Sequence, residues 1–392
     1  MDITIQPQKL SGQLAAIPSK SQAHRLLICA AFADNPTTLL CANTNQDIEA
    51  TADCLRALGA DIQRTTQGFD ITPVRQLPKQ AVLPCRESGS TLRFLLPVVG
   101  ALGVDGIFSM EGRLPQRPLS PLWEEMERMG CSLSRPTENT IHCCGKLRSG
   151  DYTISGGVSS QFISGLLFAL TLLSGESHLH ITGKLESAPY VCMTQNALKL
   201  FGVEPDVLSG QLLHSPGSIS VEGDWSNAAF FLAANTLGSF LEITNLNPDS
   251  PQGDREISTL LLVLKETNPT ISVADIPDLV PILSVVAASC NGAVFTNVQR
   301  LRLKESDRVA SVISMLRSLG GMAEATEDSL TVYPASLVGG CVDSCNDHRI
   351  AMAAAIAATV CKGPVTICGA EAVNKSYPHL WAEYRRLGGK YE

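Results

Sequence analysis

A short signature recurs along the 392 residues and limits the folds that the chain can adopt. In each copy an amphipathic helix ends in Leu, Met or Phe, followed by Gly and then a strand. Clear copies end at Gly59, Gly130, Gly202 and Gly320, and the first three glycines are 71 and 72 residues apart. Glycine suits the left-handed conformation that ends a helix. With weaker copies at residues 261–265 and 384–389, the pattern predicts six helix-and-strand units, three in each half, and an α/β or α+β class.

Composition excludes several classes of protein. Hydrophobic residues make up 44% of the chain, which is enough for large cores in two or three domains. A net charge of −8 with no basic tract argues against a nucleic-acid surface. No apolar run approaches the roughly 20 residues that cross a bilayer. The first six residues alternate like a strand and do not resemble a signal peptide, so we expect a cytoplasmic protein.

Thirteen cysteines are present, but none forms a Cys-x-x-Cys pair. Most lie in apolar segments, where a thiol behaves as a small hydrophobe; examples are Cys29, Cys54, Cys192, Cys290 and Cys361. Their spacing does not match metal-ligand patterns. We therefore predict reduced, mostly buried cysteines, with neither a metal site nor a disulfide framework.

Four apolar helices are predicted to begin with small polar residues followed by a basic or amide side chain. These starts lie at residues 19–25, 87–93, 158–161 and 346–349. Ser and Asn are good N-caps, and the free amides of a helix start attract anions. A single such start is more often an ordinary cap beside a solvated basic residue. Four of them favour the hypothesis of a cleft that binds phosphorylated small molecules.

Further basic and acidic residues fit an anion-binding enzyme. Lys304 and Arg308 are four residues apart, which predicts that they share one helical face. A proline-containing loop carries Arg117, whose fork suits carboxylate and phosphate groups. Glu305 and Asp278 are candidate proton-transfer carboxylates, although either alone is more often a surface ion-pair partner.

Nine segments, in order, resemble the motifs of the 5-enolpyruvylshikimate-3-phosphate synthase family. They are Ser19-Lys20-Ser21-x-x-His24-Arg25, Glu87-Ser88-Gly89-Ser90-Thr91-Leu92-Arg93, Gln116-Arg117-Pro118, Ser159-Ser160-Gln161-Phe162, Ser187-Ala188-Pro189-Tyr190, Val221-Glu222-Gly223-Asp224, Leu303-Lys304-Glu305-Ser306-Asp307-Arg308, Asn346-Asp347-His348-Arg349 and Asn374-Lys375-Ser376-Tyr377-Pro378. The resemblance implies two inverse α/β barrel domains, each of three βαβαββ-type repeats. One domain would hold residues 20–221, and the other residues 1–19 plus 222–392.

The resemblance also implies an activity. The carboxyvinyl group of phosphoenolpyruvate would move to the 5-hydroxyl of shikimate 3-phosphate, releasing phosphate, without a metal or organic cofactor. Residues implied to hold shikimate 3-phosphate are Lys20, Ser21, Arg25, Ser159, Ser160, Gln161, Ser187, Tyr190, Asp278 and Lys304. Those implied to hold phosphoenolpyruvate are Lys20, Gly89, Arg117, Gln161, Arg308, Arg349 and Lys375. Asp278 and Glu305 would transfer protons, with Lys20 as an acid, because addition and elimination both need opposed proton-transfer groups.

Some positions depart from the family pattern. Pro18 stands where glycine is common, His24 where asparagine is frequent, and Arg86-Glu87 where Gly-Asn is common. Arg300 replaces an asparagine that some members place on the shikimate phosphate, so it is left out of the predicted site. Gly89 preserves space beside phosphoenolpyruvate, and we therefore expect sensitivity to the competitive inhibitor glyphosate.

Two other interpretations remain open. The related UDP-N-acetylglucosamine enolpyruvyl transferase usually carries a reactive cysteine before the Arg-Pro pair, whereas residues 112–118 contain none. A non-catalytic paralogue that binds phosphorylated metabolites would be expected to lose the charged site residues, yet they are present. Nothing in the sequence demands more than a monomer or a partner other than the small-molecule substrates.

Overall fold

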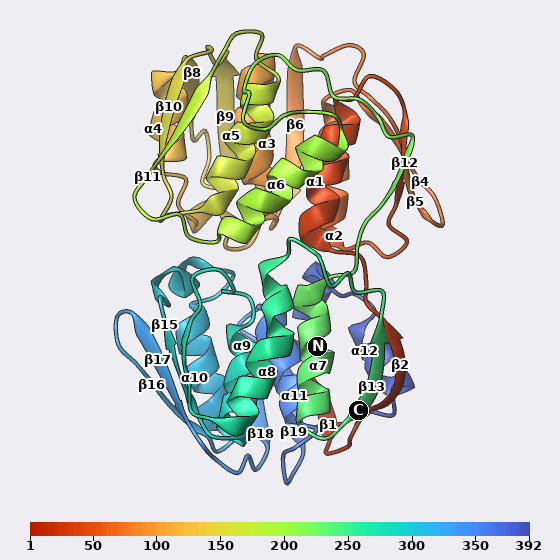
Figure 1. The fold of residues 1–392 in the computed structure, drawn as a ribbon, viewed down its shortest axis with the longest axis vertical. Coiled ribbons are helices and arrows are strands. Elements are labelled where there is room, and N and C mark those ends of the chain that lie inside the picture. The colour runs from red at the N-terminus through yellow and green to blue at the C-terminus, as the bar shows by residue number, and fades with distance from the viewer. The chain divides into compact units, whose positions relative to one another are not determined.

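A computed structural model describes residues 1–392, and the chain divides into two compact units (Figure 1). The inserted unit is Pro18–Glu222, and the terminal unit combines Met1–Ile17 with Gly223–Glu392. The chain therefore passes between the units twice. The crossings lie next to Pro18 and Gly223, within two residues of the boundaries expected from the sequence.

The inserted unit contains three sheets and six α-helices. Its elements are α1 (Lys20–Ala31), β3 (Thr37–Leu40), α2 (Gln46–Ala57), β4 (Asp61–Arg64), β5 (Gly68–Thr72), β6 (Gln80–Arg86), α3 (Gly89–Leu102), β7 (Asp105–Met110), η1 (Leu114–Gln116), α4 (Leu122–Arg128), β8 (Cys131–Ser134), β9 (Thr140–Gly145), β10 (Asp151–Ser155), α5 (Ser160–Thr171), β11 (His178–Thr182), α6 (Ala188–Leu200) and β12 (Ser218–Ser220).

The terminal unit repeats this inventory. Its elements are β1 (Ile3–Gln6), β2 (Ser11–Ala15), α7 (Trp225–Thr236), β13 (Phe240–Thr244), η2 (Gly253–Glu256), α8 (Ile257–Glu266), β14 (Thr270–Ser272), α9 (Val280–Ser289), β15 (Ala293–Thr296), η3 (Gln299–Leu303), α10 (Arg308–Ser318), β16 (Met322–Ala325), β17 (Ser329–Tyr333), β18 (Gly340–Asp343), α11 (His348–Ala357), β19 (Val365–Cys368), η4 (Ala370–Lys375), α12 (Leu380–Arg386) and β20 (Lys390–Tyr391).

The sheets share one topology, which confirms the repeated architecture. The four-stranded sheets have the orders β12-β3-β5-β4, β6-β7-β9-β8, β14-β15-β17-β16 and β18-β19-β1-β20. In each of them the first pair is parallel and the other two pairs are antiparallel. The third sheet of each unit keeps only a parallel pair, β10-β11 or β13-β2. Each unit thus holds three variants of one helix-and-sheet repeat.

The recurring glycines end helices as predicted. Gly59, Gly130, Gly202 and Gly320 follow α2, α4, α6 and α10, with φ angles of 103°, 113°, 76° and 82°. The degraded fourth copy is α8, whose cap is Thr267 instead of glycine. One detail of the prediction is wrong, because no strand follows Gly202 directly; the next strand is β12.

Inner helices form the core of each unit. Every residue of α11 is buried, and so is every residue of α9 except Ser289. In α5 only Gln161 escapes full burial, and in α3 only Ser90 and Leu102 do. A helix that is apolar on all sides must be enclosed by other elements. Of the four accessible positions, Ser90 and Gln161 lie in first turns, where site residues were predicted, and Leu102 and Ser289 are the last residues of their helices.

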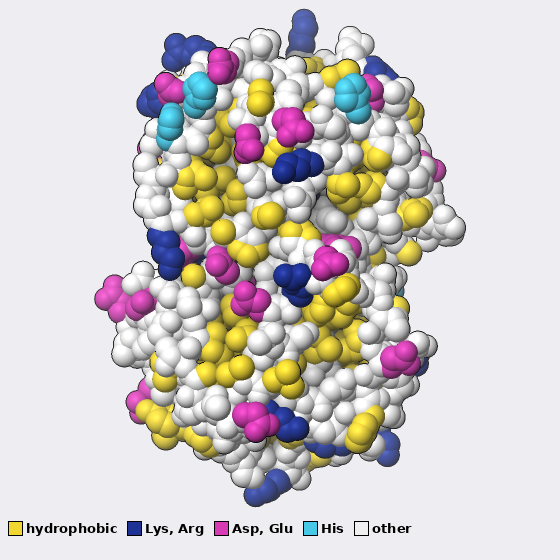
Figure 2. Space-filling view, viewed as in Figure 1, with side chains coloured by type: hydrophobic (Ala, Val, Ile, Leu, Met, Phe, Trp, Pro, Cys, Tyr) yellow, Lys and Arg dark blue, Asp and Glu magenta, His cyan; other side chains and the backbone are white.

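The surface fits the acidic composition. On the face seen in Figure 2, Lys and Arg side chains are interspersed with acidic ones. No helix is both long and apolar enough to cross a membrane. The cysteines are free, and most of those predicted to be buried are, but Cys192 is exposed. It lies on α6, whose burial alternates around the helix, so an apolar neighbourhood in sequence did not ensure an interior position.

Candidate active site

The predicted helix starts form as expected, with one correction. Ser19, Ser88 and Ser159 cap α1, α3 and α5, and each side chain accepts a backbone N–H of the first turn. The cap of α11 is Asp347, whose carboxylate accepts the N–H of Arg349 at 3.0 Å, and not Asn346. Asn346 adopts a φ of 54° before the cap. Short side chains with oxygen acceptors thus begin all four helices.

In the inserted unit, the first turn of α3 packs against a guanidinium group. A Cβ atom at Gly89 would lie 2.5 Å from Nη1 of Arg117 and 2.7 Å from Nη1 of Arg93. Glycine is therefore required for this close approach. Nε of Arg117 is buried without a hydrogen-bond partner. The arrangement offers a cation and free helix amides at one place, which suits an anionic ligand.

Gln161 joins the starts of α3 and α5. Its amide nitrogen donates to Ser90 Oγ at 3.0 Å, and its Oε1 accepts from Arg93 Nη1 at 3.0 Å. Arg93 also donates to the carbonyl of Pro118 at 3.1 Å. The sequence prediction missed Arg93, although its position one helical turn after Gly89 places both on the same face.

Arg25 is buried and holds neighbouring elements together. Its guanidinium donates to the carbonyls of Ser21 at 2.6 Å and Tyr190 at 2.7 Å, and to Thr194 Oγ1 at 2.7 Å. Burial lowers the pKa of Arg25 to about 10. Arg25 thereby fixes two predicted ligands, Ser21 on α1 and Tyr190 on α6, relative to each other.

The other predicted residues of this unit lie at the same helix starts. Ser160 is the first residue of α5, and Ser187 precedes α6 with a φ of 57°. Lys20 begins α1 and forms an ion pair with Asp47 on α2 at 2.9 Å, which the sequence did not predict. The inserted unit therefore presents the neutral donors of these helix starts together with the cations Lys20, Arg25, Arg93 and Arg117.

A buried chain of hydroxyl groups stabilises this region. His24 Nδ1 lies 2.7 Å from Thr51 Oγ1, which lies 2.6 Å from Thr91 Oγ1. Thr91 donates to Ser88 Oγ at 2.7 Å, so the chain ends at the cap of α3. Nε2 of His24 is buried without a partner, and burial lowers the pKa of His24 well below its usual value. A neutral ring that donates from Nδ1 satisfies this chain, because an orphaned acceptor costs less than an orphaned donor.

In the terminal unit, Asp278 lies at the centre of an ion cluster. Its carboxylate contacts Arg308 Nη1 at 2.7 Å, Arg349 Nη2 at 2.8 Å and Lys304 Nζ at 3.9 Å. Asp278 precedes α9, whereas the cations come from the elements around α10 and from α11. The fold thus brings together residues up to 71 positions apart.

Arg308 connects three carboxylates. Besides Asp278, it contacts Glu305 Oε2 at 2.6 Å and Asp347 Oδ2 at 3.0 Å. The side chains of Arg308 and Asp347 are both 0% exposed. Asp347 was missed as a site residue, although it caps the helix that carries Arg349. The prediction that Lys304 and Arg308 share a helical face is wrong, because Lys304 follows the end of η3 in an extended conformation and Arg308 begins α10.

The cluster shifts the acidity of its members. Burial opposes ionisation of Asp278, but Arg349, Lys304 and Arg308 outweigh it and hold the pKa of this carboxyl below its usual range. Burial lowers the pKa of Lys304 to about 8, partly offset by Asp278. Burial and the charge of Asp278 raise the pKa of Asp254, a residue on η2 that the sequence did not single out. Asp278 is therefore ionised, and Lys304 is the cation most easily lost.

Lys375 completes the terminal group. It is the last residue of η4 and is almost fully buried, and its Nζ donates to the carbonyl of Asn346 at 2.8 Å. This bond ties Lys375 to the loop that leads into α11 and Arg349. No group of three or more His, Cys, Asp or Glu side chains is arranged to hold a metal ion.

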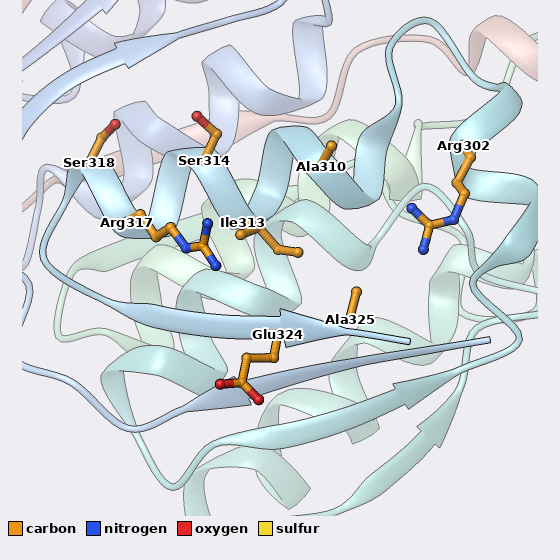
Figure 3. A pocket seen from close by; sticks show the side chains of 8 residues that line it. All are labelled: Arg302, Ala310, Ile313, Ser314, Arg317, Ser318, Glu324 and Ala325. Carbon is orange, nitrogen blue, oxygen red and sulfur yellow. The ribbon is translucent and has the colours of Figure 1, made fainter. Parts of the chain in front are cut away.

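A groove on the terminal unit contains none of the predicted residues. It is lined by the outer face of α10 and by β16, with Arg302, Arg317 and Glu324 among its side chains (Figure 3). Arg308 is on the buried face of the same helix. The exposed face of α10 thus lines the groove, whereas its buried face carries Arg308, which belongs to the Asp278 cluster.

Fold and site together define an α/β protein of two repeat-built units with basic side chains clustered at helix starts. A family model described as EPSP synthase (3-phosphoshikimate 1-carboxyvinyltransferase) matches residues 5–384. The 3-phosphoshikimate 1-carboxyvinyltransferase of Clostridium kluyveri is 39% identical over 421 residues, covering 100% of this chain and 98% of that protein. The enzyme of the same name from Clostridium acetobutylicum is 38% identical over 416 residues, covering 99% and 97%.

A solved structure of EPSP synthase from Acinetobacter baumannii has the same fold, with a TM-score of 0.81 over 100% of this chain and 99% of that one, at 23% identity. The chain belongs to the EPSP synthase family.

Proposed function

We propose that the protein transfers the carboxyvinyl group of phosphoenolpyruvate to the 5-hydroxyl of shikimate 3-phosphate, with release of phosphate, in the shikimate pathway to chorismate. Membership of the EPSP synthase family over residues 5–384 supports this activity. The observation that carries it is the Asp278 carboxylate held between Arg308 and Arg349. A reaction between two anionic substrates needs converging cations and an ionised carboxylate, and this cluster supplies both.

Shikimate 3-phosphate would bind mainly to the inserted unit. Its proposed ligands are Lys20, Ser21, Arg25, Ser159, Ser160, Gln161, Ser187 and Tyr190, together with Asp278 and Lys304. Hydroxyl and amide groups at helix starts suit a sugar-like ring bearing one phosphate. Arg25 supports this site chiefly by fixing Ser21 and Tyr190, because its guanidinium donates to their carbonyls.

Phosphoenolpyruvate would bind to Lys20, Gly89, Arg117, Gln161, Arg308, Arg349 and Lys375. The guanidinium of Arg117 against Gly89 supports this assignment, since its Nε has no partner within the chain. Glyphosate, as a competitor at this position, would inhibit the enzyme. A methyl group at Gly89 would displace Arg117 and so weaken binding of both compounds.

Asp278 and Glu305 would transfer protons, with Lys20 as a possible acid. Arg308 and Arg349 stabilise the ionised form of Asp278 and make it a weak base. An anionic substrate that takes over these arginines would raise the pKa of Asp278. The carboxylate would then accept the proton of the 5-hydroxyl as oxygen attacks C2, while a second acid protonates the methylene carbon. Elimination of phosphate reverses these roles.

We further propose that the enzyme acts as a cytoplasmic monomer without a metal or organic cofactor. In this scheme side chains alone balance the negative charge of the substrates, and the terminal unit would contribute Lys304, Arg308, Arg349 and Lys375. Size-exclusion chromatography with light scattering tests the monomer, and assay in the presence of a chelator tests the independence from metal.

The decisive assay mixes purified protein with shikimate 3-phosphate and phosphoenolpyruvate and follows phosphate release. Release that requires both substrates is expected. Parallel reactions receive UDP-N-acetylglucosamine or shikimate without its phosphate. Equal release with UDP-N-acetylglucosamine, or no release with shikimate 3-phosphate, would contradict the proposal.

A further inference from the structure

Three pairs of cysteine side chains lie in contact, and they differ in accessibility. Cys54 contacts Cys85, and Cys131 contacts Cys143, in the core of the inserted unit. All four of these residues are buried. The third pair, on the terminal unit, consists of the exposed Cys341 and the partly exposed Cys368, whose Sγ atoms are 3.4 Å apart.

The accessible pair belongs to neighbouring parallel strands. Cys341 lies on β18, the edge strand of its sheet, and Cys368 is the last residue of β19. The register pairs Cys341 with Thr366 and Asp343 with Cys368, so the two thiols occupy a diagonal on the outer face. Their alternating neighbours Val342 and Ile367 point into the core. Both sulfur atoms can therefore meet a reagent from solvent.

We propose that Cys341 and Cys368 form a reversible dithiol–disulfide site that reacts with low-molecular-weight disulfides. A disulfide bond is about 2.05 Å long, so the sulfur atoms must approach by about 1.4 Å. An edge strand and a strand end, followed by Gly369, permit such a shift. Because Cys341 and Cys368 are not directly opposite each other, the disulfide between them would be strained. A strained disulfide is easier to reduce, which favours reversibility.

The reaction balances as two thiol–disulfide exchanges. The Cys341 thiolate attacks one sulfur of the reagent, forms a mixed disulfide and releases one reagent thiolate. Cys368 then loses its proton and attacks the Cys341 sulfur, which forms the internal bond and releases the second thiolate. The contact with Cys341 raises the pKa of Cys368, so Cys341 is the first nucleophile. Two protein thiols are oxidised, and one reagent disulfide is reduced to two thiols.

The crosslink would lie beneath two loops of the candidate site. β18 leads through Ser344 to Asp347 and Arg349, and β19 leads through Gly369 to Lys375. The loops are already joined, because Ser344 Oγ donates to the Gly369 carbonyl at 2.9 Å and Lys375 Nζ donates to Asn346. Drawing the strands together would move both loop bases. This consequence, unlike the crosslink itself, rests on the proposed function.

The test treats the folded, reduced protein with 2-hydroxyethyl disulfide. This reagent is neutral, so the negative charges of Asp2 and Asp343 near Cys368 do not repel it. In the peptide that joins Cys341 and Cys368, the mass should fall by about 2 Da and return after dithiothreitol, since two hydrogens are lost, whereas the exposed Cys192 should acquire a mixed disulfide. Peptide mapping after alkylation should assign the bond to Cys341 and Cys368. Cys341→Ser and Cys368→Ser should instead retain one half of the reagent, as a mixed disulfide with the remaining thiol of the pair.

Two control variants sharpen the result. Cys85→Ser removes a buried pair, and Cys345→Ser removes a partly exposed thiol in the loop that follows β18; both variants should still form the crosslink. A bond that maps elsewhere, survives in Cys341→Ser, or fails to form would overturn the site. A confirmed crosslink with an unchanged KM for phosphoenolpyruvate would overturn only its effect on the loops, whereas absent phosphate release in the reduced protein would count against the proposed function.

Discussion

The two units are built from the same repeat, but their helix starts carry different kinds of side chain. In the inserted unit, helix starts display Ser, Gln and Gly, and separate ion pairs, Lys20–Asp47 and Arg86–Asp53, lie near them. In the terminal unit, the corresponding starts carry a network of charges around Asp278 and Arg308. Neutral donors are ready to bind without rearrangement, whereas charged groups that already neutralise one another must exchange partners. The comparison suggests that the inserted unit positions substrate and the terminal unit responds to it.

The largest effect that tests this division is expected from the carboxylates of the terminal unit. Asp278→Asn and Glu305→Gln should each lower kcat by about 10²- to 10⁴-fold, because each removes a group that we propose transfers a proton. Phosphate release under saturating substrates measures the loss. The exposed Glu327→Gln, on a nearby turn, should leave kcat unchanged. Turnover near wild type in both active-site variants would remove the proposed distinction between the units.

The ion network should also stabilise the terminal unit. Arg308→Met leaves Asp278, Glu305 and Asp347 without their shared cation, and we expect a loss of about 3–5 kcal/mol in the free energy of unfolding. Urea unfolding followed by circular dichroism measures it. Arg317→Met on the exposed face of the same helix provides the matched control and should change stability by less than about 0.5 kcal/mol. Equal effects of the two variants would show that the network is not structural.

In the inserted unit the corresponding stabilising feature is uncharged. Thr51→Val keeps the side-chain shape but breaks the buried chain between His24 and Thr91, and it should cost about 1–3 kcal/mol. The exposed Thr72→Val, on β5, is the control. The same urea titration applies. If Thr51→Val lowered the free energy of unfolding as much as Arg308→Met, the ion network of the terminal unit would not be the larger contribution to stability.

The smallest effect concerns pH. Because burial lowers the pKa of Lys304 to about 8, its ammonium group is present below that pH and is lost above it. We expect kcat/KM for shikimate 3-phosphate to fall by about tenfold per pH unit above 8, since kcat/KM reports the free enzyme. Lys304→Arg retains its charge and should extend the plateau to higher pH. An identical alkaline limb in this variant would assign the titration to another group.

Much of the fold could be predicted from the sequence, because local rules govern the features concerned. The repeat was visible since glycine is needed wherever a helix ends in a left-handed residue, as at Gly59 and Gly320. Caps such as Ser88 and Ser159 were visible because their hydrogen bonds span only two or three residues. The family resemblance along the whole chain was confirmed by the match over residues 5–384.

Partner choice across long sequence separations could not be predicted. Nothing in the sequence indicated that Asp347 would neutralise Arg308, or that Arg25 would hold the Tyr190 carbonyl 165 residues away. Lys304 and Arg308 seemed to share a helix, but a break between η3 and α10 separates them. The burial of a side chain also depends on how distant segments pack. Burial lowers the pKa of Lys304 to about 8, and the sequence did not indicate this.

By itself, then, the sequence determined the repeat, the helix starts and the residue types available for anion chemistry, since hydrogen bonds and backbone conformations within a few residues control them. Only the tertiary structure decided which cations share the Asp278 carboxylate and which helix start lies against Arg117. It also decided that, of three thiol pairs in contact, only Cys341 and Cys368 are accessible. These properties depend on contacts between distant segments and on the exclusion of water, which the order of residues along the chain does not display.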